Sequence, residues 1–212
     1  MDIRDKKVLV IGLAVSGLQT VKVLHGLGAH VKANDLKSEV ELKEAISAIK
    51  GPNVDFVLGG HPSELADWPD FAVISPGIPM DLPMVQRIRE SGREVISEVE
   101  LAYRLTATPI VAITGTNGKT TTTALTGEMF RRSGRNTHVV GNIGTPLVDA
   151  AVFSQPSDIL VAEISSFQLE GTRDFKPRAA AVLNITPDLL DRHKTFDNYT
   201  ALKARVFQNQ GP

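Results

Sequence analysis

Apolar runs of strand length alternate with amphipathic stretches of helix length along the chain. The first run, at residues 8–11, leads into a glycine, and helical spacing of leucine and valine follows from Leu18 to Leu27. Further apolar runs lie at residues 30–34, 56–58, 71–74, 94–96, 110–113, 137–140, 159–162 and 180–183. Short continuous apolar runs are typical of strands buried in a parallel sheet, and strand–helix alternation is typical of βαβ units. We therefore predict an α/β protein with parallel sheets.

A short polar stretch at residues 106–109 separates two series of these units. A length of 212 residues fits one large domain or two modest ones, at roughly 150 residues per domain. We predict a Rossmann-like domain over residues 1–106 and part of a P-loop ATPase-like α/β domain over residues 107–212. Because the second series has too few strands to complete a doubly wound sheet, we expect the chain to be a fragment of a longer protein.

The composition excludes several classes of function. The formal net charge is −1, whereas general binders of nucleic acids or membrane surfaces carry a basic excess. The chain has no cysteine, which excludes disulfides, thiolate zinc sites and cysteine nucleophiles. No secretory h-region follows the first residues, and there is no run of about 18 apolar residues. The expected state is a cytoplasmic monomer with no nucleic-acid partner and no membrane insertion.

A glycine-containing loop at residues 12–17 follows the first strand and opens a helix. Backbone N–H groups at such a helix start bind phosphate, although this arrangement is about as often a packing feature. A dinucleotide fingerprint needs glycine where this chain has Ala14, which counts against a nicotinamide-dependent dehydrogenase. Asp35, at the end of the second strand, stands where a ribose-binding acid would lie.

A second loop, Ser-Pro-Gly-Ile-Pro at residues 75–79, follows another predicted strand. Its two prolines fix a rigid loop at the carboxyl edge of the sheet, where open α/β sheets bind ligands. A plain tight turn is the alternative, and it would be preferred for this stretch considered alone.

The strongest signal is the sequence Thr-Gly-Thr-Asn-Gly-Lys-Thr-Thr at residues 114–121, which a strand enters and a helix leaves. Successive N–H groups of such a loop form an anion site, its lysine reaches the β- and γ-phosphates, and its threonine hydroxyl can bind Mg²⁺. ATP or GTP binding is favoured over a structural turn. The residues predicted to hold the nucleotide are Gly115, Thr116, Asn117, Gly118, Lys119, Thr120 and Thr121.

Phosphoryl transfer also needs carboxylates that hold a metal beside the phosphates. Glu163 ends an apolar strand at the same sheet edge as the loop, where a glutamate is costly unless it is paired or bound to metal. Mg²⁺ binding is favoured over a structural salt bridge. Asp188, Asp191 and His193 either face the same cleft or form a solvated, helix-capping loop. From the residues alone, Lys203 is only a surface lysine with a buried stem.

With these motifs the chain resembles the Mur ligases over essentially its whole length. The match rests on residues 10–17, 75–79, 97–101, 114–121, 141–144, 163–170, 184–188 and 201–205. Residues 165–170, Ser-Ser-Phe-Gln-Leu-Glu, point to the D-glutamate-adding branch of the family. The resemblance implies a three-domain, ATP-dependent ligase. It places the rest of the central domain and the C-terminal amino-acid-binding domain beyond this chain.

The resemblance implies that the whole ligase adds D-glutamate to UDP-N-acetylmuramoyl-L-alanine in peptidoglycan synthesis. ATP phosphorylates the substrate carboxylate, and the amine of D-glutamate then displaces phosphate from the acyl phosphate. The family's N-terminal domain is Rossmann-like but binds UDP, which explains the missing glycine. The implied UDP-substrate site consists of Leu13, Ser16, Gly17, Asp35, Lys37, Ser75, Pro76 and Gly77.

Carried over to this sequence, the resemblance assigns Lys119 to the ATP phosphates and Asn142 to the substrate and the transferring phosphate. Thr120 would ligate one Mg²⁺ and Glu163 a second. Lys203 matches a lysine that the family carbamylates, and the carbamate supports the metal as a carboxylate would. Carbamylation requires a neutral amine and hence a lowered lysine pKa.

One residue departs from the family pattern. After Asp188 the family usually has histidine, a ligand of the second metal, whereas this chain has Leu189, which offers no lone pair. His193 lies one helical turn further on and is a possible substitute ligand. The alternative function is therefore a non-catalytic module that binds a UDP-sugar or nucleotide without turnover.

Overall fold

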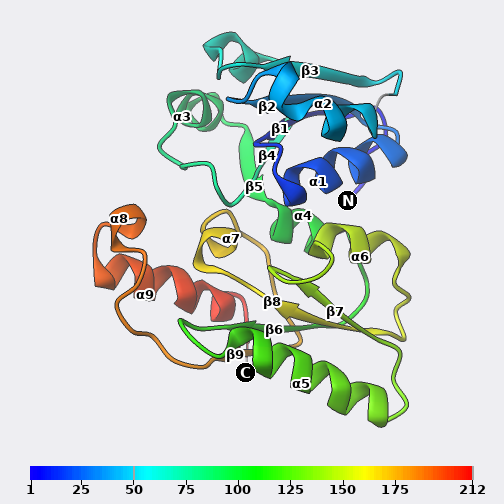
Figure 1. Cartoon of the computed structure of the whole chain (residues 1–212), viewed down its shortest axis with the longest axis vertical. Coiled ribbons are helices and arrows are strands. Elements are labelled where there is room, and N and C mark those ends of the chain that lie inside the picture. The colour runs from blue at the N-terminus through cyan, green and yellow to red at the C-terminus, as the bar shows by residue number, and fades with distance from the viewer. Residues whose placement is uncertain (50, 212) are drawn as a thin grey trace. The chain divides into compact units, whose positions relative to one another are not determined.

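The computed structural model describes residues 1–49 and 51–211. The chain divides into two compact units, Met1–Leu101 and Ala102 onward, each with its own parallel sheet and helices (Figure 1). The predicted α/β class with parallel sheets is confirmed. Our sequence-based boundary after Thr106 lies at the far end of helix α4 (Glu98–Leu105), which begins in the first unit.

The first unit contains a five-stranded parallel sheet with the order β3-β2-β1-β4-β5. Its strands are β1 (Lys7–Ile11), β2 (His30–Asp35), β3 (Val54–Leu58), β4 (Phe71–Ile74) and β5 (Glu94–Ser97). Val8 in β1 pairs with Val31 on one side and with Phe71 on the other. The strand order reverses between β1 and β4. In open α/β sheets, the carboxyl ends of the strands at such a switch point form the ligand-binding crevice.

Helices cover this sheet and supply its core. They are α1 (Val15–Gly26), α2 (Glu39–Ser47), the 3₁₀ helix η1 (Ser63–Asp67), α3 (Pro83–Glu90) and α4. Ser38 precedes α2, and its N–H donates to Glu41 Oε2 at 2.8 Å in a capping box. Pro83 begins α3, where its missing N–H leaves no bond unmade. Leu9 and Met84 are buried between sheet and helix in the core.

The second unit contains a four-stranded parallel sheet with the order β7-β8-β6-β9. Its strands are β6 (Ile110–Thr114), β7 (Thr137–Gly141), β8 (Ile159–Glu163) and β9 (Ala179–Val182). Its helices are α5 (Lys119–Arg132), α6 (Leu147–Phe153), α7 (Ser166–Glu170), α8 (Leu190–His193), α9 (Phe196–Ala204) and the 3₁₀ helix η2 (Arg205–Phe207). Across the described residues, no helix is long and apolar enough to cross a membrane.

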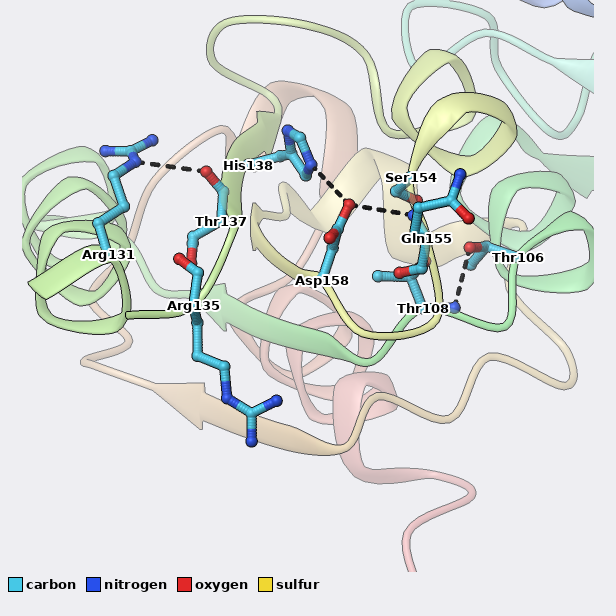
Figure 2. A network of polar contacts seen from close by, with 9 residues as sticks. All are labelled: Thr106, Thr108, Arg131, Arg135, Thr137, His138, Ser154, Gln155 and Asp158. Atoms are coloured by element: carbon cyan, nitrogen blue, oxygen red, sulfur yellow. Dashed lines mark hydrogen bonds and ion pairs between the residues drawn. The ribbon is translucent and has the colours of Figure 1, made fainter. Parts of the chain in front are cut away.

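Polar contacts join the starts of β7 and β8 (Figure 2). Asp158 Oδ2 accepts a hydrogen bond from Gln155 N at 3.0 Å and one from the His138 ring at 3.1 Å. Thr108 Oγ1 donates to Gln155 O at 2.9 Å. The Gln155 N–H, followed by the His138 side chain, lowers the pKa of the Asp158 carboxyl. These contacts fix the turn before β8, at the sheet edge opposite the glycine loop.

The carboxylate of Asp158 is expected to stabilise the fold in a pH-dependent way. Because its folded pKa lies below the unfolded value of about 3.9, its contribution is present above pH 4 and is lost as the pH falls through the folded pKa. Asp158→Asn should therefore lower Tm at pH 7 and have progressively less effect below pH 4. Thermal unfolding followed by circular dichroism tests this, with the exposed Asp81→Asn as the control. A Tm difference that is constant with pH contradicts it.

Candidate functional site

The glycine loop of the second unit runs from the end of β6 to the start of α5. Gly118 stands immediately before α5 with a φ of 80°, in the left-handed region that favours glycine. At Gly115 a Cβ would lie 3.2 Å from the Leu183 side chain. The two glycines thus let the chain turn sharply beside the segment that follows β9. The N–H groups at the start of α5 then form an anion site with the helix dipole behind it.

The segment after β9 holds this loop in shape. Asn117 N donates to Asn184 Oδ1 at 2.9 Å, and Asn184 Nδ2 donates back to Asn117 O at 3.0 Å. Thr116 Oγ1 accepts from Thr186 N at 3.0 Å and lies 3.1 Å from the Tyr199 hydroxyl. The loop is therefore preorganised by hydrogen bonds from two other elements.

Glu163, Thr120 and Asn142 come together at the carboxyl edge of this sheet. Glu163 is only 2% exposed, and both of its carboxylate oxygens accept hydrogen bonds. Thr120 Oγ1 donates to Oε2 and Asn142 Nδ2 donates to Oε1, each at 2.8 Å. Asn142 can come this close because the preceding residue, Gly141, has no Cβ. A Cβ there would lie 2.3 Å from Glu163 O. The side chain of Glu163 thus accepts hydrogen bonds from neutral donors and does not form the salt bridge that was considered from the sequence.

The Thr120 and Glu163 side chains suit a magnesium ion that is also bound by phosphates and water, rather than a metal ion held by protein ligands alone. No group of three or more His, Cys, Asp or Glu in the described part of the chain is arranged to hold a metal. Mg²⁺ is usually bound through one or two carboxylates together with substrate phosphates and water. The Thr120 hydroxyl and the Glu163 carboxylate, next to a phosphate-type loop, fit that mode of binding.

Our sequence-based interpretation of Lys203 as a surface lysine with a buried stem was wrong, because its whole side chain is buried. It is 2% exposed, and its Nζ donates to Gly115 O at 2.7 Å and lies 4.6 Å from the centre of the Tyr199 ring. Burial, followed by the charge of Lys119, lowers the pKa of Lys203 to about 8, and the charge of Asp188 opposes this shift. Helix α9 thus places an easily deprotonated amine against the glycine loop.

His193 makes different contacts from those considered for it. Its Nε2 lies 3.0 Å from Ser166 Oγ, and its ring stacks on Phe167 with centroids 4.8 Å apart. The Tyr199 ring covers it as well, at 5.0 Å. Burial, followed by the charge of Arg192, lowers the pKa of the His193 imidazole and favours its neutral form. The ring therefore packs α8 against α7 and α9, while Asp188 and Asp191 are exposed.

Leu189 has a left-handed backbone conformation, with a φ of 52°, and its side chain is 43% exposed. This conformation costs a residue with a Cβ about 1–2 kcal/mol, and asparagine tolerates it better than leucine. Leu189→Asn is therefore expected to raise the free energy of unfolding by about 1 kcal/mol. Urea denaturation measures this, and Leu36→Asn, at an exposed leucine outside the left-handed region, is the control. An unchanged or lower stability of Leu189→Asn contradicts the prediction.

The loops after β1 and β4 meet at the carboxyl edge of the first sheet, where the strand order reverses. Ser75 Oγ donates to Gly12 O at 2.7 Å. A Cβ at Gly17 would lie 1.8 Å from Gly12 O, so only glycine permits this approach of α1 to the loop. Ser75 is thus a buried clamp, whereas Pro76 is half-buried and Gly77 exposed.

Asp35 and Ser16 place polar side chains beside the same loop. Asp35 Oδ2 accepts from Leu13 N at 2.6 Å, and Oδ1 accepts from Lys37 N at 2.8 Å. Ser16 Oγ, in the first turn of α1, is buried and has no hydrogen-bond partner among the described residues. A buried hydroxyl without a partner is costly, and a phosphate oxygen at this helix start would satisfy it.

Three residues of these sites escaped the sequence analysis. Tyr199 lies four residues before Lys203 on α9, a spacing that places both on one helix face. Asn34 precedes Asp35 in β2, where a polar residue inside an apolar strand is itself a signal. Its partner His61 lies beyond β3, and the sequence gives no indication of that pairing.

A parallel sheet with a glycine loop, a lysine and threonine at the following helix start, and a buried carboxylate on the neighbouring strand define a P-loop α/β protein. Residues 6–97 match the Mur ligase MurD-like N-terminal domain, and residues 113–212 match the Mur ligase middle domain. The chain belongs to the Mur ligase family.

Relatives and solved structures agree with this assignment. Proteins named UDP-N-acetylmuramoylalanine--D-glutamate ligase are 53% identical in Alkaliphilus metalliredigens and 48% identical in Clostridioides difficile, each over 99% of this chain. The chain spans 47% of the length of both relatives. The structure of a Neisseria meningitides UDP-N-acetylmuramate:L-alanyl-gamma-D-glutamyl-meso-diaminopimelate ligase has a TM-score of 0.58 at 19% identity, covers 97% of this chain and 68% of its own, and shows the shared fold.

Proposed function

We propose that this chain belongs to a ligase that uses ATP to join D-glutamate to UDP-N-acetylmuramoyl-L-alanine through an acyl phosphate. The observation that carries the proposal is the Thr120–Glu163–Asn142 cluster beside a preorganised glycine loop. Its support is identity of about half to relatives named for this reaction. Residues 1–106 would hold the UDP-linked substrate and residues 107–212 would hold ATP.

In this proposal the glycine loop, Gly115 to Thr121, binds the ATP phosphates. Its N–H groups face the phosphate oxygens, and the Lys119 ammonium compensates their charge. Thr120 would hold one Mg²⁺ and Glu163 a second, and these ions would supply further positive charge to the phosphates. Asn142 would donate from Nδ2 to the substrate or to the transferring phosphate. Such fixed donors stabilise charge in phosphoryl transfer because they need no reorganisation.

Lys203 is proposed to work as a carbamate. With a pKa of about 8, roughly a tenth of its amine is neutral at pH 7 and about half at pH 8, far more than for an ordinary lysine. The neutral nitrogen attacks the carbon of CO₂, a proton leaves, and the side chain becomes an anion. That anion would lie against the glycine loop and support the metal as a carboxylate would.

The first unit is proposed to bind the uridine diphosphate of the substrate. The N–H groups at the start of α1, with Leu13, Ser16 and Gly17, would receive the phosphates. Asp35 and Lys37 would bind the nucleoside. In this crevice Ser75 acts through the loop that it clamps, and Pro76 and Gly77 shape the opposite wall.

Titration calorimetry tests the proposal directly. The wild-type chain is expected to bind UDP-N-acetylmuramoyl-L-alanine, and ATP·Mg²⁺ should give a second, separate signal. A folded sample that binds ATP·Mg²⁺ but not the UDP-sugar contradicts the substrate assignment. A sample that binds neither contradicts both assignments.

Leu189 favours a second candidate function, a nucleotide-binding module without turnover. Its side chain offers the metal no lone pair, and the neighbouring His193 ring packs against Ser166, Phe167 and Tyr199. Leu189→His supplies an imidazole at this position. A gain in Mg²⁺ affinity in the variant favours the module, because it shows that the wild-type chain lacks a metal ligand at the position of Leu189. An unchanged affinity favours the ligase.

A further inference from the structure

Asn34 is a fully buried side chain next to Asp35, the last residue of β2. Its Nδ2 donates two hydrogen bonds, to Val57 O and to Gly60 O, both at 2.7 Å. Its Oδ1 lies 2.6 Å from His61 Nδ1. The Asn34 amide is thus committed to the turn that follows β3.

The protonation of the His61 ring follows from these contacts. Val57 O and Gly60 O can only accept hydrogen bonds, so the Asn34 NH₂ group must face them and Oδ1 must face His61. Because an amide oxygen cannot donate, His61 Nδ1 must carry the proton. His61 therefore acts toward Asn34 as a hydrogen-bond donor.

The turn that Asn34 holds also supports the segment after β2. Gly59 N donates to Lys37 O at 2.9 Å, and Gly60 N donates to Asp35 O at 3.4 Å. Gly59 has a φ of 82°, so this turn depends on glycine to reach both carbonyl groups. The position of the turn is therefore coupled to the backbone of Asp35 and Lys37.

Asn34 reaches the glycine loop of the first unit as well. Its backbone O accepts from Gly12 N at 2.8 Å, and the neighbouring Asp35 Oδ2 accepts from Leu13 N at 2.6 Å. One buried residue thus links the turn after β3 to the glycine loop after β1 and to the segment after β2. Neutral, buried and fully bonded, Asn34 fixes these elements without offering its amide to a ligand.

We propose that Asn34 and His61 are a positioning pair for the nucleotide half of the substrate site in the first unit. The His61 N–H holds the Asn34 amide in one orientation, and this amide holds the turn that supports Asp35 and Lys37. Loss of the N–H releases the turn and lowers the affinity for UDP. The inference rests on the proposed function, because it concerns residues assigned there to the UDP-linked substrate.

Two replacements of nearly equal shape test the pair. His61→Asn keeps an N–H donor near the place of Nδ1, whereas His61→Asp supplies only acceptors that face Asn34 Oδ1. Calorimetry with UDP as the probe is run at a temperature where circular dichroism shows each protein to be folded. His61→Asn is expected to bind UDP within about threefold of wild type, and His61→Asp about tenfold or more weakly. ATP·Mg²⁺ affinity should be the same in all three proteins.

The outcomes test the Asn34–His61 pair and the proposed function of the first unit separately. Equal UDP affinities of the two variants overturn the pairing alone. A folded wild type that does not bind UDP overturns the proposed function and the inference with it. If His61→Asp does not fold, His61→Phe keeps a ring without the N–H and should show the same loss. Nitrogen-15 NMR of wild type should find the proton on Nδ1, and a ring protonated only on Nε2 overturns the pairing.

Discussion

Lys119→Ala is expected to weaken ATP·Mg²⁺ binding about a hundredfold and to leave UDP binding unchanged. The Lys119 Nζ already lies over the glycine loop, where it donates to Thr116 O at 2.9 Å. A hydrogen bond to a charged group contributes up to about 3 kcal/mol, and each 1.4 kcal/mol changes affinity about tenfold. Calorimetry of the variant with both ligands measures the effect.

Two further substitutions serve as controls. One removes a lysine that lies away from the glycine loop, and the other keeps the positive charge at position 119. Lys176→Ala removes an exposed lysine just before β9, at the other edge of the sheet, and should leave ATP affinity unchanged. Lys119→Arg keeps the charge but changes its shape, so it should recover only part of the binding. Equal loss of ATP and UDP binding in Lys119→Ala contradicts the assignment of the two ligands to separate units.

The second large effect is expected at Lys203, which should form a carbamate in bicarbonate buffer. At pH 8, about half of an amine with a pKa of about 8 is neutral, against roughly 0.3% for a lysine at 10.5. The reactive fraction is thus more than a hundredfold larger than for an exposed lysine. Carbon-13 NMR with labelled bicarbonate should show one lysine carbamate signal per chain, apart from the signal of the terminal amine.

The assignment of this signal needs two variants. Lys203→Met should abolish the carbamate signal, while Lys176→Met should retain it. The signal should fade as the pH falls below 8, because protonation removes the nucleophile. A signal of equal strength in Lys203→Met would show that another amine reacts, and it contradicts the prediction.

The fold was largely predictable because the buried strands of a parallel sheet are short, mostly apolar runs that are easily recognised in the sequence. Strands such as β1 and β6 are continuous apolar runs, and a glycine follows each of them at the carboxyl edge. Helices α6, α7 and α8 were not predicted. None of them exceeds seven residues, which is too short to show a helical period.

The glycine loop and the position of Glu163 beside it were predictable, because the loop is a run of consecutive residues and Glu163 stands at a strand end. The burial of Lys203 was missed because it depends on how α9 packs against a loop 88 positions away in the chain. The contact of Asn34 with His61 joins residues 27 positions apart and depends on the register of β2 with β3. Local patterns specify elements, whereas these contacts arise only when the elements assemble.

The two hydrogen bonds that hold Glu163 bear on the order in which ligands would bind under the proposed function. A divalent cation that came to Glu163 by itself would compete with the Thr120 and Asn142 donors for the carboxylate oxygens. The Thr120 hydroxyl would also have to rotate, so that it offers a lone pair instead of its proton. A nucleotide that carried the cation would bring phosphate oxygens to complete its coordination and offset this loss. Under the proposed function, the site would therefore bind the metal–nucleotide complex as one ligand in preference to free Mg²⁺.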